Sequence, residues 1–275
     1  MNNNVKILSC YYKSNDFVPK SDIYIPIQCG VDSTGLDLGI LGDNTGDNIS
    51  GRNRYWSEIT GLYWAWKNMT PVDIIGLCSY RRFFNFKHGP FIPITKVEPK
   101  SNYSEIDNIK IPDIPRLLDK YDIIVPKKYW YAYSIRNVCR MNYNIEDFRV
   151  LQDVINELYP DYSFAFKDYF ERHNYFYGHN MFIMRWSDFD AYCKWVFDIL
   201  LETERRTDPV SYSVSRVRLY GYMHELLLSL YIFKNKLKKY ESQLTWVTDE
   251  LTESQFNSIP YKIAANCSFF FNKPR

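Results

Sequence analysis

The sequence predicts an α/β protein with a mixed, mostly parallel sheet flanked by helices. Short apolar runs at residues 5–10, 72–78 and 121–126 are bounded by polar turns or proline, as expected for buried strands. Segments with apolar residues three and four positions apart, at 55–68 and 145–158, alternate with these runs and predict helices. At 275 residues, 46% of them hydrophobic, the chain can form one large domain, and no internal repeat or linker divides it.

Composition excludes several classes of function. The formal net charge is only +2, which does not support nucleic-acid binding. Aromatic residues make up 18% of the chain, and aromatic clefts are common in carbohydrate binders because sugar rings pack on aromatic rings, although tyrosine also suits strands and interfaces. The six cysteines form no CxxC pair and no Cys/His cluster, which argues against a zinc site and indicates a reducing compartment.

Two features predict where the protein is located. The chain passes from Met-Asn-Asn-Asn directly into a strand, so no signal peptide is expected. No run of about eighteen apolar residues occurs, so no membrane-spanning helix is expected. We therefore expect a cytoplasmic protein. Its tail, with Phe269, Phe270, Phe271, Lys273 and Arg275, leaves open a peripheral contact with the inner face of the cell membrane.

The first elements lead to a candidate phosphate-binding lysine. The strand at 5–10 is followed by a polar turn at 11–16, and in nucleotide-binding α/β sheets this loop commonly meets the base or ribose. Lys13 in the turn either contacts a phosphate or is an ordinary surface lysine. Residues 23–31 predict a second strand, which Pro26 favours as an edge strand.

A polar loop and an aromatic helix come next. The loop 42–51 is dense in Gly, Asn and Asp, which tolerate positive φ or bond their own backbone. Either Ser50 or Asn48 is a candidate N-cap for the helix 55–68, which Pro71 ends. By itself, such a loop is more often a simple connection than a site.

Two arginines follow the strand at 72–78. Tyr80, Arg81 and Arg82 stand just past its carboxyl end, which is where ligands bind in open α/β sheets. Guanidinium groups suit phosphate oxygens, although adjacent arginines are also often a solvated pair. The polar loop and the arginines bracket one helix, and this combination favours a site for an anionic ligand.

The rest of the chain predicts further helices and one more strand. Residues 85–111 form a long irregular excursion, and 127–144 are either a mobile loop at the site or an ordinary ordered loop. A strand is predicted at 121–126, and helices are predicted at 114–120, 145–158, 162–173, 189–204 with Asp188 as its cap, and 219–236.

Three polar residues in this half are candidates for chemistry. His179 and Asn180 enter an apolar run at 177–184, where they either face a ligand or satisfy a turn. Glu225 lies in the otherwise apolar helix 219–236, where a carboxylate is unusual, although a solvated glutamate is the commoner case.

These blocks resemble, in order and spacing, a bacterial family of capsular and exopolysaccharide glycosyltransferases filed as domain-of-unknown-function family 4422. The most specific block reads GDNTGDNIS, then SEITGLYWAWKN, then an apolar strand into SYRRFF. The resemblance continues at YDIIVP, HNMFIMRWSDFDAYCKWVFDIL and RLYGYMHELLLSLYI, and covers nearly the whole chain. Three positions depart from the family pattern: Ser79 replaces a usual His, Tyr12 replaces the His of a His-Lys pair, and Leu226 replaces an Arg after Glu225.

The resemblance implies a single GT-A-like glycosyltransferase domain, with a nucleotide-sugar half at about 1–126 and an acceptor half at about 127–275. It implies transfer of a hexosyl unit, with galactofuranose among the candidates, from a nucleotide-sugar that we expect to be UDP-linked. The acceptor would be a growing capsule, O-antigen or exopolysaccharide, free or lipid-linked. The expected donor-binding residues are Lys13, Asn44, Asp47, Asn48, Ser50, Asn53, Tyr80, Arg81, Arg82 and Asn180. Glu225 is the first candidate for the catalytic base, followed by Asp47 and His179.

The sequence also bears on metal dependence. No Asp-x-Asp pair stands near Arg81, where related folds carry a metal site. A departing diphosphate is stabilised either by a metal ion or by cationic side chains. We therefore expect Arg81, Arg82 and Lys13 to supply this charge. No cofactor is strictly required in this interpretation, and Mn²⁺ or Mg²⁺ remains compatible with it.

Two other functions compete with this one. A non-catalytic carbohydrate-binding component of a polysaccharide assembly machine would explain the aromatic content, but it would have no use for a phosphate site. An enzyme acting on another phosphorylated metabolite would be expected to show a GxxxxGK[ST] loop, which the chain lacks. Nucleotide binding separates a transferase from the carbohydrate binder.

Overall fold

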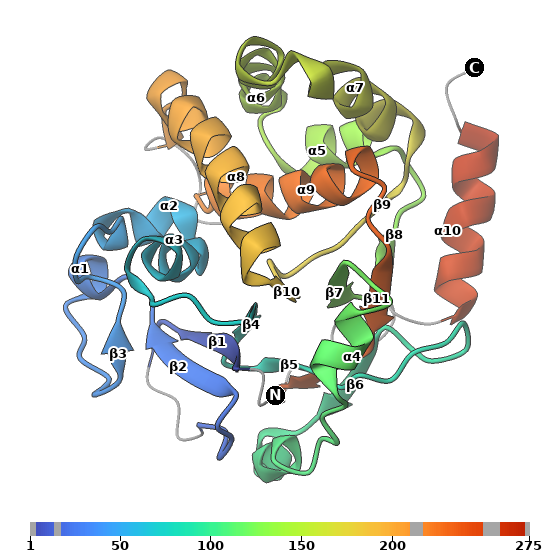
Figure 1. The fold of residues 1–275 in the computed structure, drawn as a ribbon. Coiled ribbons are helices and arrows are strands. Elements are labelled where there is room, and N and C mark those ends of the chain that lie inside the picture. Colours follow the sequence, from blue (N-terminus) through green and yellow to red (C-terminus); the bar gives the residue numbers. More distant parts are fainter. Residues whose placement is uncertain (1–3, 14–17, 210–216, 250–258, 273–275) are drawn as a thin grey trace.

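A mixed β-sheet forms the centre of the computed structural model, which describes residues 4–13, 18–209, 217–249 and 259–272 (Figure 1). Across the sheet, the strands are β3 (Leu41–Gly42), β2 (Tyr24–Gln28), β1 (Val5–Tyr11), β4 (Ile74–Ser79), β10 (Phe182–Arg185), β7 (Ile123–Pro126) and β11 (Lys239–Ser242). Within this row β10 alone is antiparallel to its neighbours. The predicted mixed, mostly parallel sheet is confirmed.

Shorter strands extend this framework. β5 (Arg82–Phe84) pairs with β4 and with β12 (Leu244–Val247), which also pairs with β6 (Thr95–Glu98). A separate hairpin joins β8 (Tyr129–Trp130) to β9 (Tyr175–Phe176). Strands from late in the chain therefore complete the sheet on the side of β4 that lies away from β1.

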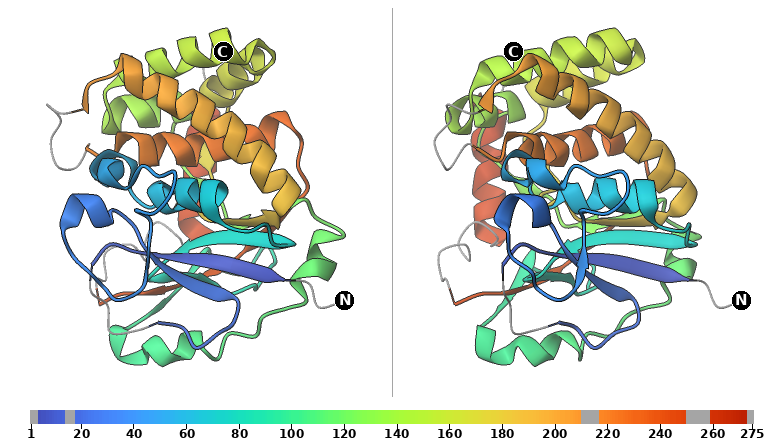
Figure 2. Two further views of the ribbon diagram at one scale, coloured as in Figure 1. Left: turned by 60° about the vertical axis from the view of Figure 1, so that its left-hand side comes forward. Right: turned by 90° about the vertical axis from the view of Figure 1, so that its left-hand side faces the viewer.

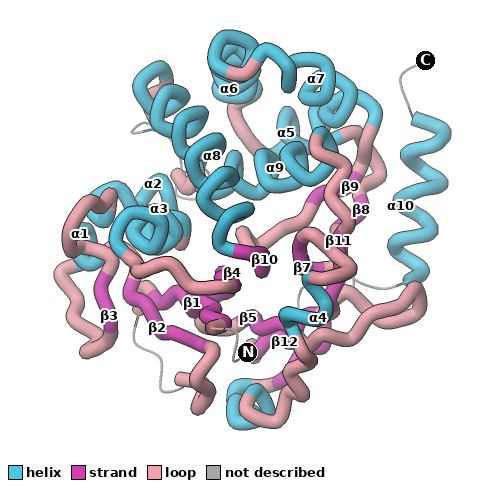
Figure 3. Tube along the Cα trace, in the orientation of Figure 1, coloured by secondary structure: helices cyan, strands magenta, loops and turns pink. Residues whose placement is uncertain are grey.

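The two faces of the sheet bury different sets of side chains, because successive residues of a strand point to opposite faces. Leu8, Ile75 and Leu77 belong to the larger cluster, which includes the long helices, whereas Ile7 and Ile74 belong to the smaller one. Figure 2 shows the long helices stacked over one face of the sheet, and Figure 3 shows how helices and strands separate into layers.

The helices vary widely in length. Over the larger cluster lie α2 (Asn53–Trp56), α3 (Ile59–Asn68), α5 (Ile135–Asn142), α6 (Ile145–Leu158), α7 (Ser163–Arg172), α8 (Trp186–Arg206) and α9 (Leu219–Lys234). The remaining helical segments are α1 (Val31–Thr34), α4 (Ile114–Leu118), α10 (Ile259–Asn272) and the 3₁₀ turns η1 (Ser50–Arg52), η2 (Lys100–Ile106) and η3 (Pro160–Tyr162). None of the described helices is both long enough and apolar enough to cross a membrane.

The predicted helix 55–68 is interrupted, and this correction matters for the site. The chain forms α2 and then α3, and between them Ser57 has a φ of 54°. That left-handed conformation is uncommon outside glycine and breaks the helical hydrogen-bond ladder. Neither Ser50 nor Asn48 caps α2, whose N-cap is Arg52.

Several boundaries also differ from expectation. The excursion at 85–111 contains β6 and η2, and 127–144 contains β8 and α5, so both segments carry regular structure. Asp188 lies inside the first turn of α8, because that helix begins at Trp186 with Arg185 as its N-cap. Pro26 pairs with Ser9, and β3 pairs only with the end of β2, so half of β2 is an open edge. The C-terminal α10 and β12 were not predicted.

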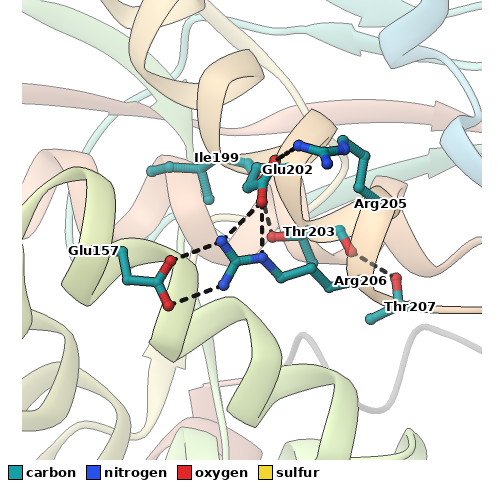
Figure 4. A network of polar contacts seen from close by, with 7 residues as sticks. All are labelled: Glu157, Ile199, Glu202, Thr203, Arg205, Arg206 and Thr207. Atoms are coloured by element: carbon teal, nitrogen blue, oxygen red, sulfur yellow. Dashed lines mark hydrogen bonds and ion pairs between the residues drawn. The ribbon is translucent and has the colours of Figure 1, made fainter.

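A network of surface charges joins α6 to α8 (Figure 4). Arg206 donates two hydrogen bonds to Glu157 on α6, at 3.0 and 2.7 Å, and a third to Glu202 on its own helix at 2.8 Å. These bonds and the positive charge hold the pKa of both carboxyl groups below the usual range. Exposed pairs of this kind contribute little stability, so we assign the network to fixing the orientation of α6.

Candidate functional site

A cavity of about 380 Å³ opens at the carboxyl ends of β1, β2 and β4. Because these strands are parallel neighbours, their ends meet at one edge of the sheet, the usual position of a ligand site in open α/β folds. The lining residues come from the strand ends, from the α2–α3 break and from the start of α9. They are Cys10, Tyr11, Tyr12, Cys29, Asn53, Arg54, Ser57, Glu58, Ser79, Tyr80, Arg81, Arg82, Val217 and Arg218.

A buried carboxylate shapes the turn where β2 enters the cavity. Asp43 is fully buried and accepts hydrogen bonds from the backbone N–H of Gly30 at 2.8 Å and of Val31 at 3.3 Å. The Ser50 hydroxyl donates a third bond to Asp43 at 2.5 Å. A carboxylate is tolerated inside a protein when its oxygens are satisfied in this way. The polar loop therefore braces the turn that forms one wall of the cavity.

The other predicted residues of this loop also make structural contacts. Asn44 donates to Asp32 at 3.1 Å, the Tyr63 hydroxyl donates to Asp47 at 3.1 Å, and Asn48 accepts from the Ser50 backbone N–H at 3.1 Å. None of Asn44, Asp47, Asn48 and Ser50 lines the cavity. Asn, Asp and Ser side chains bond nearby backbone in turns, and this property accounts for their density here.

Asn53 does line the cavity, and a glycine makes room for it. Gly30 has a φ of +77°, and a Cβ added there would lie 2.5 Å from the Asn53 Cβ. The Asn53 amide donates to the Ser57 carbonyl at 2.8 Å and to the Thr60 hydroxyl at 3.1 Å. The glycine thus permits the close approach that holds Asn53 across the break between α2 and α3.

Gly30→Ala is expected to destabilise the protein by about 2–4 kcal/mol, from the left-handed conformation and the clash with Asn53 together. Gly35→Ala is the matched control, because Gly35 also has a positive φ, +64°, but an added Cβ meets nothing within 4 Å. We expect the control to lose only about 1–2 kcal/mol. Urea unfolding of the two variants measures the difference, and equal losses would contradict the role assigned to the Asn53 contact.

The helix break places Glu58 in the cavity wall. Its carbonyl accepts hydrogen bonds from the thiols of Cys10 and Cys29, each at 3.7 Å, and so joins the segment to β1 and to the end of β2. Its carboxylate Oε1 accepts from the Asn180 amide at 3.2 Å. Glu58 was not among the site residues predicted from the sequence. Its position could have indicated a role in the site, because it is an acidic residue at the start of an otherwise apolar helix, directly after the glycine-bearing loop.

Cationic side chains dominate this cavity. Arg54, Arg81, Arg82 and Arg218 line it, and Glu58 is the one acidic residue among the described lining residues. The Arg82 guanidinium lies 4.5 Å from the centre of the Trp246 ring, and that of Arg81 lies 5.7 Å from it. Such stacking orients a guanidinium group, and guanidinium groups suit bidentate bonds to phosphate oxygens.

The rim residue Tyr12 shows the effect of the same positive charges on its pKa. The Lys13 ammonium lies 5.7 Å from the Tyr12 ring centre and 5.9 Å from that of Tyr80. Burial acts to raise the pKa of Tyr12, but the hydrogen bond with Tyr80 and the charges of Lys13, Arg218 and Arg81 together outweigh burial and lower it. The structure therefore places Lys13 near Arg81 and Arg218, around the same two tyrosine rings.

A partly buried carboxyl group lies near Arg82. Glu225 on α9 accepts a hydrogen bond from the His179 backbone N–H at 2.9 Å. Burial, and then the charge of Glu58, raise the pKa of Glu225 to about 8, against the opposing effects of that bond and of Arg82. Perturbed carboxyl groups beside a ligand cavity are candidates for general acid or base chemistry.

His179 and Asn180 have left-handed backbone, with φ of 71° and 54°. This geometry directs the His179 amide at Glu225. The buried Asn180 donates its side-chain amide to Glu58, and its Oδ1 accepts a hydrogen bond from His224 Nδ1 at 2.7 Å. Burial, then the charges of Arg82 and Arg81, lower the pKa of His179, and its Nε2 lies 2.7 Å from the Tyr129 hydroxyl. Consecutive left-handed non-glycine residues are uncommon and concentrate at functional sites.

The structure brings most predicted residues together and separates the rest. The predicted residues that line the cavity or lie at its rim are Lys13, Asn53, Tyr80, Arg81 and Arg82. Glu225, His179 and Asn180 form a second group that is coupled to the cavity through Glu58, Arg81 and Arg82. Asp47 is exposed and lies with the loop residues outside the cavity, so the structure does not place it as a base.

The described residues contain no group of three or more His, Cys, Asp or Glu that could hold a metal ion. All six cysteines are free thiols, and five of them are buried.

The chain has an α/β fold that is also found in a solved glycosyltransferase. It is similar to the solved apo structure of WbbM, a bifunctional glycosyltransferase, with a TM-score of 0.79 and 30% sequence identity over 90% of this chain and 46% of that chain. The chain thus spans about half the length of that protein. No curated protein matches the chain. A family model described as "domain of unknown function (DUF4422)" matches residues 6–236, and the chain belongs to this family.

Proposed function

We propose that the protein is a glycosyltransferase that moves a hexosyl unit from a nucleotide-sugar, with UDP as the expected nucleotide, to a glycan acceptor. One observation carries this proposal: a cavity lined by four arginines lies near a partly buried carboxyl group, Glu225, whose pKa is raised to about 8. A diphosphate leaving group needs the first feature, and an acceptor hydroxyl needs the second. Similarity to a bifunctional glycosyltransferase over 90% of the chain supports the same activity.

The proposed reaction is an inverting displacement. Arg81 and Arg82 bind the donor diphosphate and offset the negative charge that grows on it as the bond between the sugar C1 and the phosphate oxygen breaks. The acceptor hydroxyl oxygen forms the new bond to C1, and its proton passes to the Glu225 carboxylate. His179 and Asn180 position this carboxylate and Glu58 through the bonds described above.

The biological setting belongs to the same proposal. The family resemblance supports a growing capsule, O-antigen or exopolysaccharide as the acceptor, and galactofuranose is one candidate sugar. Reaction with a nucleotide-sugar supports a cytoplasmic location, with peripheral contact at the inner face of the membrane where a lipid-linked acceptor would be found.

Thermal shift against nucleoside diphosphates and nucleotide-sugars tests the function. We expect UDP and a UDP-sugar to raise the melting temperature by about 2–8 °C at 100 times Kd, because ligand binding at that ratio adds about 2.7 kcal/mol. We expect the shift, and donor turnover, to persist in EDTA, because arginines supply the charge. Activity that is lost in EDTA and restored by Mn²⁺ would contradict the metal-independent form, and no shift with any nucleotide would favour a non-catalytic carbohydrate-binding component.

A further inference from the structure

A second cavity of about 380 Å³ is lined by the loop after β5, by the segment that follows β7, by β11 and by α10. It shares no lining residue with the first cavity. The residues that matter for its chemistry are Lys127, Lys128, Lys239, Lys262, Trp130 and Glu241.

Positive charge is concentrated in this second cavity. Four lysines line it, and Glu241 is the one carboxylate among its described lining residues. The Lys128 ammonium forms an ion pair with the Glu241 carboxylate at 3.4 Å, and the Tyr177 hydroxyl donates a hydrogen bond to the same carboxylate at 3.1 Å. No ion pair to Lys127, Lys239 or Lys262 occurs in the described part of the chain.

Lys127 shows that the cluster is built into the fold. Its side chain is buried, and its ammonium donates to the carbonyl oxygens of Gly89 and Ile92, at 2.5 Å each. Burial, and then repulsion from Lys262, lower the pKa of Lys127, against the opposing effect of the Glu241 charge. A lysine is rarely buried without a partner of opposite charge, because desolvation and like charges both disfavour the ammonium ion. An anion in the cavity would relieve both effects.

The wall of the cavity also suits a sugar. The Trp130 ring lies 5.1 Å from the Lys128 ammonium and 5.6 Å from that of Lys262, so an aromatic face stands beside the charges. Pro90, Ile92 and Pro93 add apolar surface. An aromatic platform next to ammonium groups fits a sugar ring that carries a phosphate.

Short connections link this cavity to the proposed catalytic group. Lys128 directly precedes Tyr129, whose hydroxyl lies 2.7 Å from His179 Nε2. Tyr177, which bonds Glu241, stands two residues before His179, whose amide bonds Glu225. Short stretches of chain therefore join the second cavity to His179 and, through the His179 amide, to Glu225.

We propose that the second cavity binds the phosphate or diphosphate group of a phosphate-linked glycan acceptor. The identity of the ligand as an acceptor rests on the proposed function, whereas the anion site itself does not. The phosphate could be on a lipid anchor or on a free sugar phosphate. The helix α10, which supplies Lys262, exposes 76% of Phe270 and 83% of Phe271, which is apolar surface suited to a nearby lipid.

Calorimetric titration with inorganic pyrophosphate tests the site. We expect two sites per chain, of which Arg81→Ala weakens one and the double variant Lys239→Glu/Lys262→Glu weakens the other, each at least tenfold. Both substituted lysines lie at the cavity surface, so folding should persist, and circular dichroism checks it. Lys194→Glu, an exposed change on α8 outside both cavities, is the control and should retain both sites. A single site that Arg81→Ala removes, with no effect of the double variant, would overturn the proposal.

Two further binding measurements identify the source of the phosphate. Both use the Arg81→Ala variant, so that their results do not depend on whether the first cavity binds a nucleotide. Binding to phosphatidylcholine vesicles that contain farnesyl diphosphate, lost when the two lysine changes are added, supports a lipid-linked acceptor. Binding of glucose 1-phosphate in solution without such vesicle binding supports a soluble sugar phosphate. Absence of binding in both arms and to pyrophosphate overturns the anion site even if the donor site binds UDP as proposed.

Discussion

Glu225→Gln is expected to reduce sugar transfer by a factor of about 10² to 10⁴, the usual contribution of a positioned general base. Glutamine keeps the shape of the side chain and can still accept the His179 N–H bond, but it cannot take a proton. Donor affinity should stay unchanged, because the arginines that bind the diphosphate are intact. Turnover assays and UDP titration of the same variant measure both quantities. Turnover within about threefold of wild type, with donor binding retained, would remove Glu225 from the role of base.

The pH dependence of the reaction provides a second readout of Glu225. A base must be deprotonated, so kcat/KM of the wild type should rise with pH and level off above the pKa of about 8. Arg82 lowers this pKa, so Arg82→Ala should move the profile to higher pH as well as weaken the donor. Arg205→Ala on α8, whose side chain pairs with Glu202 outside the cavity, should leave the profile unmoved.

Stability should respond to the same proton in the opposite sense. The folded-state pKa of Glu225 is raised from 4.5 to about 8, so between these values the native state holds a proton that the unfolded state releases. The stability that this carboxyl contributes is fully present below the lower value and is lost as pH rises through the upper one. The melting temperature of Glu225→Gln, relative to that of the wild type, should therefore increase from pH 5 to pH 8. A constant difference would argue against a shifted pKa.

Arg81→Ala is expected to weaken UDP binding by about 10- to 100-fold, because hydrogen bonds to charged groups contribute about 1.5–3 kcal/mol. The thermal shift with UDP should fall in proportion. Arg81→Lys should recover only part of the affinity, since an ammonium group cannot form a bidentate bond to phosphate. Arg205→Ala removes an arginine from the surface of α8 and should bind UDP as the wild type does. If both alanine variants bind UDP equally well, the cavity at β4 is not the diphosphate site.

Local patterns were sufficient to predict the sheet and its mostly parallel order. The apolar runs at β1, β4 and β7 each have both faces buried, so their composition alone separates them from the solvent-facing segments. The arginines after β4 were found because the carboxyl end of a parallel strand is a recurrent ligand position. The period of α6 matched its observed bounds, because that helix buries one regular apolar stripe.

Local sequence patterns could not predict contacts between residues that are far apart in the chain. Glu58 and Asn180 are 122 residues apart, and nothing local to either one indicates that they bond. The loop residues Asn44 and Asp47 were expected at the cavity because Asn and Asp occur equally in ligand loops and in self-bonded turns, and only the tertiary structure distinguishes the two. The break at Ser57 was missed because apolar residues keep helical spacing across it. The strand β12 was missed because it is short and borders a turn.

The place of β10 in the sheet has a consequence for synthesis of the chain. β4 pairs with β1 early in the sequence, but its other edge stays open until residues 182–185 have been made and Phe182 can pair with Leu77. Chains emerge from the ribosome N-terminus first, and an unpaired apolar strand edge is prone to associate with other chains. The nascent polypeptide therefore carries an exposed, aggregation-prone edge for more than a hundred codons.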